Sequence, residues 1–564
     1  MSSPQLPPGT HVPVLVGSLP GRQQSSQFLP PPPPPEDVAE ANNHYRRPRP
    51  VMATGYGTSD AALPPTGQTG KLPHEALTEH SALLGHADTH GDLSAEEAGS
   101  TRRLLKELGS LSRLASPVVM AFLLQKSIDI TSVFSLGHLG AQELAASALG
   151  TMFIAVTGWS VALGMATALD TLASQAYTAS PDPRMLGIYL QRAILVLMLM
   201  AVPIAGLWWY ADSVLVMLGQ EPELSALSGL FIRWSMFSLV PYVGFECIKR
   251  YLQAQGIMHA GTYILMITSP LNVLTNYLLV WWPPISLGFI GAPIATSCTH
   301  WLNLLLGVLF VRYVDGSRCW GGWSREALRD WGPFIRLGLA GVAFVCGEWW
   351  AFEVVALAAG YLGTVPLAAQ SIILTTASFT YMIPAGVSIA ACNRIGNELG
   401  LRHANRAKLA AYSALLLALI ISTFNTTFLI LLKDRWGYLF NSDPEVVALV
   451  GTLLPIAALF QVGDVFGGVG GGILRGIGQQ HIGAYLTIVS YYFISLPLGL
   501  YLTFSLDMGL AGLWWGLCLA LFIVAIGEVR VIMRADWQEE VERCATRISG
   551  DASATVYDEE AYIA

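Results

Sequence analysis

Two carboxylates lie in the middle of one strongly apolar segment. Glu348 and Glu353 occur within residues 334–360, and residues 337–360 carry no other charge. About 20 apolar residues are enough to cross a bilayer, so this segment predicts a membrane-spanning helix. An ionised group in hydrocarbon is costly, and such residues usually face a polar cavity or a partner. The pair therefore predicts a binding or proton-handling site within the membrane.

Helix geometry and neighbouring side chains suggest how this site could work. Glu348 and Glu353 would lie about 140° apart around a helix, so one is expected to face a cavity and the other a neighbouring helix. The best acidic neighbour is Asp464, in the tenth apolar segment. A carboxylate deprived of water, or sharing a site with another, binds a proton more readily. When ionised it attracts an organic cation, to which Trp349 and Trp350 could offer ring faces. Competition between proton and cation for one negative charge is the simplest basis of antiport.

Three further polar residues are candidates with open alternatives. Asp129 follows Lys126 by three residues, which allows either a local ion pair or a second cation site. Gln370 could hydrogen-bond a substrate or another helix. Tyr381, near Pro384, is more typical of a residue that shapes its helix, but it is kept as a candidate binding residue.

The composition places these residues in a polytopic membrane protein. Of 564 residues, 53% are hydrophobic and only 12% charged, against about 25% charged in soluble domains. Mean hydropathy is +0.49. Seven cysteines without paired spacing predict neither a disulfide framework nor a zinc site. We find no nucleophile–base set, metal cluster, cofactor motif or nucleic-acid motif, so an enzyme is the least favoured class.

Twelve apolar segments predict an all-α fold of twelve transmembrane helices. They fall near residues 113–137, 144–172, 187–210, 224–247, 260–282, 288–313, 334–360, 366–392, 408–432, 446–472, 482–505 and 508–532. Residues 1–100, which contain the run Pro30–Pro35 and no long apolar block, predict a disordered tail, and residues 536–564 a second tail. Twenty Lys and Arg residues flank one set of helix ends and three flank the other. By the positive-inside rule both tails are expected in the cytosol. The plasma membrane and the vacuolar membrane both remain open.

The two halves of the chain resemble one another. The motif from Gly164 to Gln175 matches that from Gly386 to Asn397, and Arg250 matches Arg475 at nearly the same offset along the chain. Since each half holds an even number of helices, the halves are parallel repeats, a known plan for transporters. We expect lobes at 105–320 and 330–535, with the substrate path between them.

Polar sets recur at corresponding places of the two repeats. They are expected to act as struts between helices within a lobe rather than as ligands. Asp170 and Gln175 should accompany Arg250, and Arg394 and Asn397 should accompany Arg475. The glycine-rich run 467–472 predicts close helix packing or a flexible bend.

Taken together, these motifs resemble the multidrug and toxic compound extrusion (MATE) family, in its eukaryotic, fungal-like branch. The resemblance spans about residues 105–535 and is carried by Gly137-His-Leu-Gly140, the segment 168–177, Arg250 to Gln255, Glu348-Trp-Trp350, Pro384-Ala-Gly-Val387, Arg394 to Gly400 and Leu474-Arg-Gly476. It implies a two-lobe antiporter that exports organic cations, xenobiotics or metabolites against H⁺ or, less often, Na⁺. It also implies that Glu348, Glu353 and Asp464 are the functional acids.

The chain departs from family patterns at two positions. Many bacterial members have an Asp in the first helix where this chain has Ser132, which favours a proton site in the second lobe. Mammalian relatives have a Glu in the eighth helix where this chain has Thr375.

The alternatives are a Na⁺-coupled exporter, a flippase for a lipid-linked substrate and a receptor or scaffold that transports nothing. A flippase would need a basic cavity. The expected partners are small organic cations, protons and the lipid bilayer, and the chain is expected to act as a monomer without a cofactor.

Overall fold

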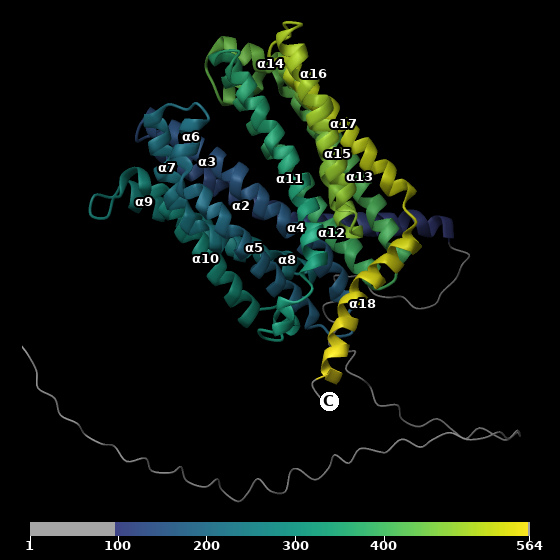
Figure 1. Cartoon of the computed structure of the whole chain (residues 1–564). Coiled ribbons are helices and arrows are strands. Elements are labelled where there is room, and N and C mark those ends of the chain that lie inside the picture. Colours follow the sequence, from purple (N-terminus) through teal and green to yellow (C-terminus); the bar gives the residue numbers. More distant parts are fainter. Residues whose placement is uncertain (1–95, 562–564) are drawn as a thin grey trace, which may run out of the picture. The chain divides into compact units, whose positions relative to one another are not determined.

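The structure is a computed structural model of the chain and describes residues 96–561, with side chains described for 101–549. Every regular element of the described part is a helix, and the chain runs as a succession of long helices (Figure 1). The longer ones are α2 (Glu96–Gly137), α3 (Ala141–Ile154), α4 (Ser160–Ala179), α5 (Met185–Trp209), α7 (Pro222–Ser235), α8 (Leu239–Ala254), α9 (Ala260–Val280), α10 (Gly291–Tyr313), α11 (Trp331–Gly360), α12 (Thr364–Gly400), α13 (Ala404–Trp436), α14 (Pro444–Ile477), α17 (Leu510–Arg534) and α18 (Trp537–Ala561). Short elements complete the order: η3 (Ala155–Trp159), α6 (Ala211–Met217), η4 (Met236–Ser238), η5 (Gly288–Ile290), η6 (Ser317–Cys319), η7 (Arg325–Leu328), η8 (Gly437–Leu439), α15 (Gln480–Ile488), η9 (Val489–Ser495) and α16 (Leu496–Phe504). The predicted tail 1–100 lies outside the described residues except for 96–100, which begin α2.

All twelve predicted spans are present in the described residues. Each predicted apolar segment coincides with a helix, or with a continuous run of helical pieces, long and apolar enough to cross a membrane. The chain is an integral, multi-pass membrane protein. Several helices extend beyond their apolar segments; α12, for example, continues to Gly400. Its extra turns carry Arg394 and Glu398, which are buried against other helices.

Packing confirms the internal repeat. We call α2–α10 the N half and α11–α17 the C half; the lobe limits 105–320 and 330–535 themselves stay predictions. A Cβ on Gly164 would collide with Val342 of α11, and one on Gly386 would collide with Val119 of α2. Gly164 and Gly386 are matching positions of the two repeats, and Val119 and Val342 match at almost the same offset. The same close contact is therefore made twice, once in each direction between the halves.

Equivalent residues of the two halves also touch each other directly. Gly396 packs on Ser174, and Gly400 packs on Thr178, and the members of each pair are related by the offset that relates Gly164 to Gly386. Two copies of one position can meet only on the axis that relates them. The crossing of α4 and α12 therefore marks the pseudo-two-fold axis.

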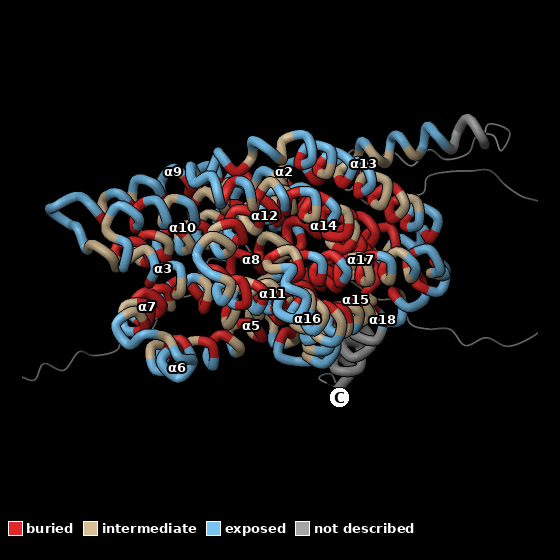
Figure 2. Tube along the Cα trace, turned by 90° about the horizontal axis from the view of Figure 1, so that it is seen from above, coloured by how far each residue is buried: buried red, intermediate tan, exposed pale blue. Residues whose placement is uncertain are grey.

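The halves meet along a seam formed mainly by α4 against α11 and α12, and by α12 against α2. Burial is concentrated along α8, α12, α14 and α17, while the outer helices expose apolar faces (Figure 2). Along α4 and η3 the seam reaches Val156, whose carbonyl accepts a hydrogen bond from the Trp350 indole at 3.0 Å. Toward its C-terminal end, past Trp350, α11 exposes Leu357, and Tyr361 directly after the helix is exposed as well.

The predicted C-terminal tail forms a docked helix instead. Trp537, Val541, Cys544 and Ile548 are buried at helical spacing on one face of α18. The first three pack into a cluster with C-half helices, whereas Ile548 packs into the N-half core. Arg547 donates a hydrogen bond to Gln175 of α4. The apolar stripe explains why this charged segment folds back onto the protein.

The pH should control how tightly α18 docks. Burial raises the pKa of the Glu540 carboxyl above its ordinary value, and Arg543 and Arg547 only partly offset this effect. The docked helix therefore holds the proton more tightly than a free helix would. Docking is fully favoured below the ordinary pKa of Glu and weakens as the pH rises through the raised value.

We expect α18 amides to exchange with solvent deuterium faster, relative to intrinsic rates, at about pH 8 than at about pH 5. Glu540→Gln should remove this difference, and Glu542→Gln, at an exposed position of the same helix, should preserve it. Equal protection of the wild-type helix at both pH values would contradict this assignment.

Candidate functional site

A small cavity inside the C half brings Glu348 together with two tyrosines. The space is narrow, about 10 Å³, and its lining comes from α11, α12, α14, α15, η9 and α17. The lining residues are Phe344, Glu348, Tyr381, Gly467, Gly468, Thr487, Tyr491, Leu521 and Val524. Tyr491 lies in η9, a π-helical segment, and such segments frequently occur at functional sites. The cavity combines one acid with aromatic faces and hydroxyl groups.

Asp464 stands beside this cavity as the predicted acidic neighbour of Glu348. It is 5% exposed, and its carboxyl accepts a hydrogen bond from Gln461 at 3.5 Å. On α14 it precedes the lining residues Gly467 and Gly468 by one turn, so it shares their face. Its charge interacts with that of Glu348. The two acids from the seventh and tenth spans therefore belong to one site.

The glycine-rich run of α14 allows close packing. The helix continues through it without interruption, and the alternative of a flexible bend stays a prediction. A Cβ on Gly468 would lie 2.8 Å from the Tyr381 ring, and one on Gly472 would collide with Ser388. Tyr381 consequently reaches the cavity because position 468 has no side chain.

The remaining candidates of the C half lie apart from the cavity lining. Glu353 is half-buried, and Trp349 is exposed. The Trp350 indole donates a hydrogen bond to the Val156 carbonyl at the seam. Gln370 is buried, and its Oε1 accepts a hydrogen bond from the Trp514 indole at 2.7 Å. This bond is the helix-bonding role that was expected as one alternative, and a role of Gln370 in substrate binding stays a prediction.

In the N half, Asp129 forms the local ion pair that its spacing allowed. The Lys126 Nζ lies 3.5 Å from its carboxylate, and both side chains are exposed. Whether this pair also serves a cation stays a prediction.

The N half also holds an acid that sequence reasoning missed. Glu246 of α8 is buried and pairs with Lys249 and Arg250, each at 2.6 Å.

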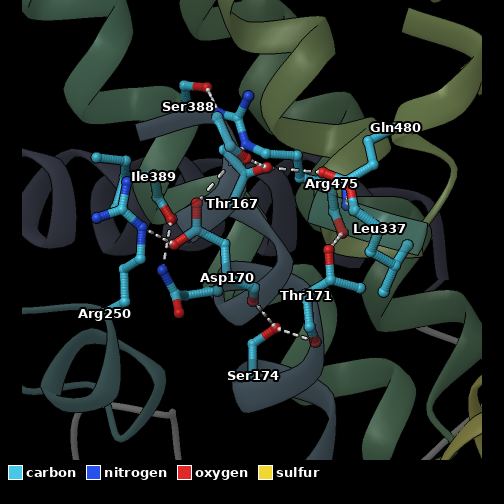
Figure 3. Close-up of polar contacts among 12 residues, drawn as sticks. Thr167, Asp170, Thr171, Ser174, Arg250, Leu337, Ser388, Ile389, Arg475 and Gln480 are labelled. Atoms are coloured by element: carbon cyan, nitrogen blue, oxygen red, sulfur yellow. Dashed lines mark hydrogen bonds and ion pairs between the residues drawn. The ribbon is translucent and has the colours of Figure 1, made fainter. Parts of the chain in front are cut away.

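The polar set around Asp170 contains the predicted pair with Arg250 inside the N half, and it also joins the two halves, which was not predicted. Figure 3 shows the Asp170 carboxylate between two guanidinium groups. Arg250 of the N half lies 3.0 Å away and Arg475 of the C half 3.9 Å away. Thr171 donates to the Arg475 carbonyl at 2.7 Å, and Gln175 donates to the Gly476 carbonyl at 2.9 Å. These bonds cross the seam.

The matching set in the C half is also rearranged. Arg394 binds Glu107 of α2 at 2.9 Å and Glu398 of its own helix at 3.0 Å, instead of accompanying Arg475. The Asn397 amide donates to the Ala254 carbonyl of α8 at 3.3 Å. Both residues therefore connect α12 to the N half. The predicted structural role of these residues stands, but they connect halves rather than helices of one lobe.

Glu528 is the acid of the C half that sequence reasoning missed. It lies in α17 and is 0% exposed. Its charge interacts with those of Glu348 and Arg475. The signal was present, because Glu528 is a carboxylate within the last predicted apolar segment, 508–532.

Together these features define a class: a polytopic transporter built from two repeated six-helix halves, with an acidic, aromatic cavity in the second half. The MatE family model matches residues 117–278 and 342–501. Protein DETOXIFICATION 16 of Arabidopsis thaliana is 37% identical over 82% of this chain and 95% of that protein. Multidrug and toxin extrusion protein 1 of Xenopus tropicalis is 36% identical over 86% of this chain and 85% of that protein. An uncharacterised transporter of Schizosaccharomyces pombe is 41% identical over 80% of this chain and 83% of that protein.

Among solved structures, the crystal structure of the eukaryotic MATE transporter AtDTX14 has a TM-score of 0.74 and 28% identity, and the match covers 79% of this chain and 99% of that one. This protein belongs to the MATE family of multidrug and toxin extrusion transporters.

Proposed function

We propose that this protein is a proton-coupled antiporter that exports organic cations, xenobiotics or cationic metabolites. One observation carries the proposal: Glu348 and Asp464 interact beside an aromatic cavity in the middle of the C half. Two buried acids repel each other when both are ionised, so the site gains from binding either a proton or a cation. Binding of one therefore discourages binding of the other.

The lining of the cavity supports an organic cation as the substrate. Phe344, Tyr381 and Tyr491 present aromatic side chains next to the Glu348 carboxylate. Ring faces attract cations, and most strongly where water is excluded. An acidic lining also opposes the flippase alternative, because a pyrophosphate group would meet Glu348 and Asp464. The one nearby guanidinium, Arg475, is already bonded to Ser388 at 2.9 Å.

Coupling to protons is supported by the chemistry of the acids. A proton needs a single carboxylate oxygen, whereas hard metal cations prefer several oxygen ligands around them. In the described residues no three His, Cys, Asp or Glu side chains gather in a group that could hold a metal ion. We therefore favour H⁺ and keep Na⁺ as the alternative.

The orientation and setting belong to the same proposal. The positive-inside rule puts both termini, and with them α18 and the Asp170 set, on the cytosolic side. In this orientation the seam is closed toward the cytosol. The chain would transport as a monomer from the cytosol across the plasma membrane or into the vacuole, without enzymatic chemistry.

Purified protein in proteoliposomes tests the proposal. A fluorescent organic cation should accumulate when an outward-directed proton gradient is imposed, and should not accumulate above the no-gradient level when a Na⁺ gradient of equal size replaces it. Accumulation should rise with the size of the pH step. Transport driven by Na⁺ alone would reject proton coupling, and no transport under either gradient would reject the antiporter.

A further inference from the structure

Glu528 lies on α17, a cavity-lining helix, one turn beyond the residues that line the cavity. Leu521 and Val524 of α17 line the cavity, and Glu528 follows Val524 by four residues, so the three share one helix face. Phe344, another lining residue, packs on Gly471 and Gly483. Its ring lies between the cavity and the pocket that holds Glu528.

The pocket is shaped for this carboxyl group by missing side chains. A Cβ on Gly470 would lie 2.5 Å from Oε2 of Glu528, and one on Gly483 would lie 3.3 Å from Oε1. Any larger residue at position 470 would displace the carboxyl group. The glycines of α14 and α15 therefore accommodate a buried acid as well as close helix packing.

This acid has no side-chain hydrogen-bond partner among the described residues. Both oxygens of Glu528 are buried without a well-formed hydrogen bond, and the backbone of Gly471 is the polar group that acts on the carboxyl. The charged and titratable groups that interact with it are Arg475, Glu348, Tyr381 and Tyr491. Arg475 is the single cation among them. It donates a hydrogen bond to the Ser388 hydroxyl at 2.9 Å, and it lies 3.9 Å from the Asp170 carboxylate across the seam. An unpaired carboxylate ion in such a place is far more costly than the neutral acid, so the acid carries its proton here.

Opening of the seam would change the partners of Arg475. Asp170 is in the N half and Arg475 is in the C half, so separation of the halves removes Asp170 from Arg475. A buried guanidinium without an anion is costly, and the acids of its own half that interact with Arg475 are Glu528 and Glu348.

We propose that Glu528 carries a proton while the seam is closed and releases it when the seam opens, its carboxylate then pairing with Arg475. The O–H bond of Glu528 breaks, the proton passes to cytosolic water, and the carboxylate keeps the electron pair. Glu528 is thus a positioning and coupling residue that links the cavity acids to the seam. The inference rests on the proposed antiport.

The test measures seam opening as a function of pH. Spin labels are placed on Asp182→Cys, which follows α4, and Asn405→Cys, at the start of α13, in a Cys298→Ser background; positions 182 and 405 are exposed, and Cys298 is the exposed native cysteine of the described chain. In nanodiscs, the wild-type background should move from a short to a long distance between the labels as the pH rises from about 5 to about 9. Glu528→Gln keeps the shape of the neutral acid but cannot ionise. Its distance should stay short at every pH, and uptake driven by a pH gradient should fall about tenfold or more.

The outcomes separate the two proposals. One outcome is that the wild type shows uptake, but the label distance in Glu528→Gln changes with pH as it does in the wild type. This outcome overturns the role of Glu528 and leaves the antiporter intact. No uptake driven by pH in the wild type overturns the antiporter first. If Glu528→Gln does not fold, Glu528→Asp decides: its carboxyl is drawn back from Arg475 by one methylene, so opening should need a higher pH, and an unshifted profile overturns the proposal.

Discussion

Replacing Glu348 with Gln should abolish cation export driven by a pH gradient while leaving the protein folded. Gln has nearly the same shape but can neither bind a proton nor carry a negative charge. Removing one partner of a buried charge pair typically costs about 2–5 kcal/mol of binding, so affinity for an organic cation should fall about 30-fold or more. Binding of a fluorescent cation and uptake into proteoliposomes measure the two effects.

The same helix provides a matched control. Glu353 is an identical residue type, half-buried and outside the cavity lining, so Glu353→Gln should change cation affinity by no more than about threefold. Asp464→Asn should resemble Glu348→Gln. Wild-type uptake in both Glu348→Gln and Asp464→Asn would reject the assignment, and an equal loss in Glu353→Gln would show that the cavity alone does not define the site.

Asp170→Ala should lower the stability of the protein more than the removal of a carboxylate from an exposed helix position. It leaves Arg475 without its carboxylate at the seam, whereas Arg250 retains Glu246. Breaking a buried ion pair by removing one partner costs about 3–5 kcal/mol, and the retained Glu246 pair places the expected loss near the lower limit. Thermal unfolding in detergent, followed by tryptophan fluorescence, should show a melting temperature several degrees lower.

Two variants show whether the charge or the position matters. Asp170→Asn keeps a hydrogen-bond acceptor and should be intermediate in stability. Asp434→Ala removes a carboxylate from an exposed position of α13 and should leave the melting temperature unchanged. An Asp170→Ala protein as stable as the wild type would mean that the Asp170 set does not hold the seam together.

Several features followed from local order along the chain. The spans were predictable because a helix must be apolar over its whole length in the membrane, whatever its neighbours are. The repeat was visible because each half preserves the residues that pack on its counterpart, such as Gly164 and Gly386. The buried acids were recognisable because ionisable residues within apolar segments are rare.

The partners of these residues were decided by the tertiary structure. Helical spacing predicted that Glu348 and Glu353 diverge, but the packing of α11 against α15 and η9 determined that Glu348 faces the cavity. Arg475 was assigned to its own half because only neighbours in the sequence could be compared, whereas its carbonyl and guanidinium meet α4 across the seam. Spacing along a chain sets the direction of a side chain around its own helix, and contacts between helices far apart in the sequence depend on how the helices are placed.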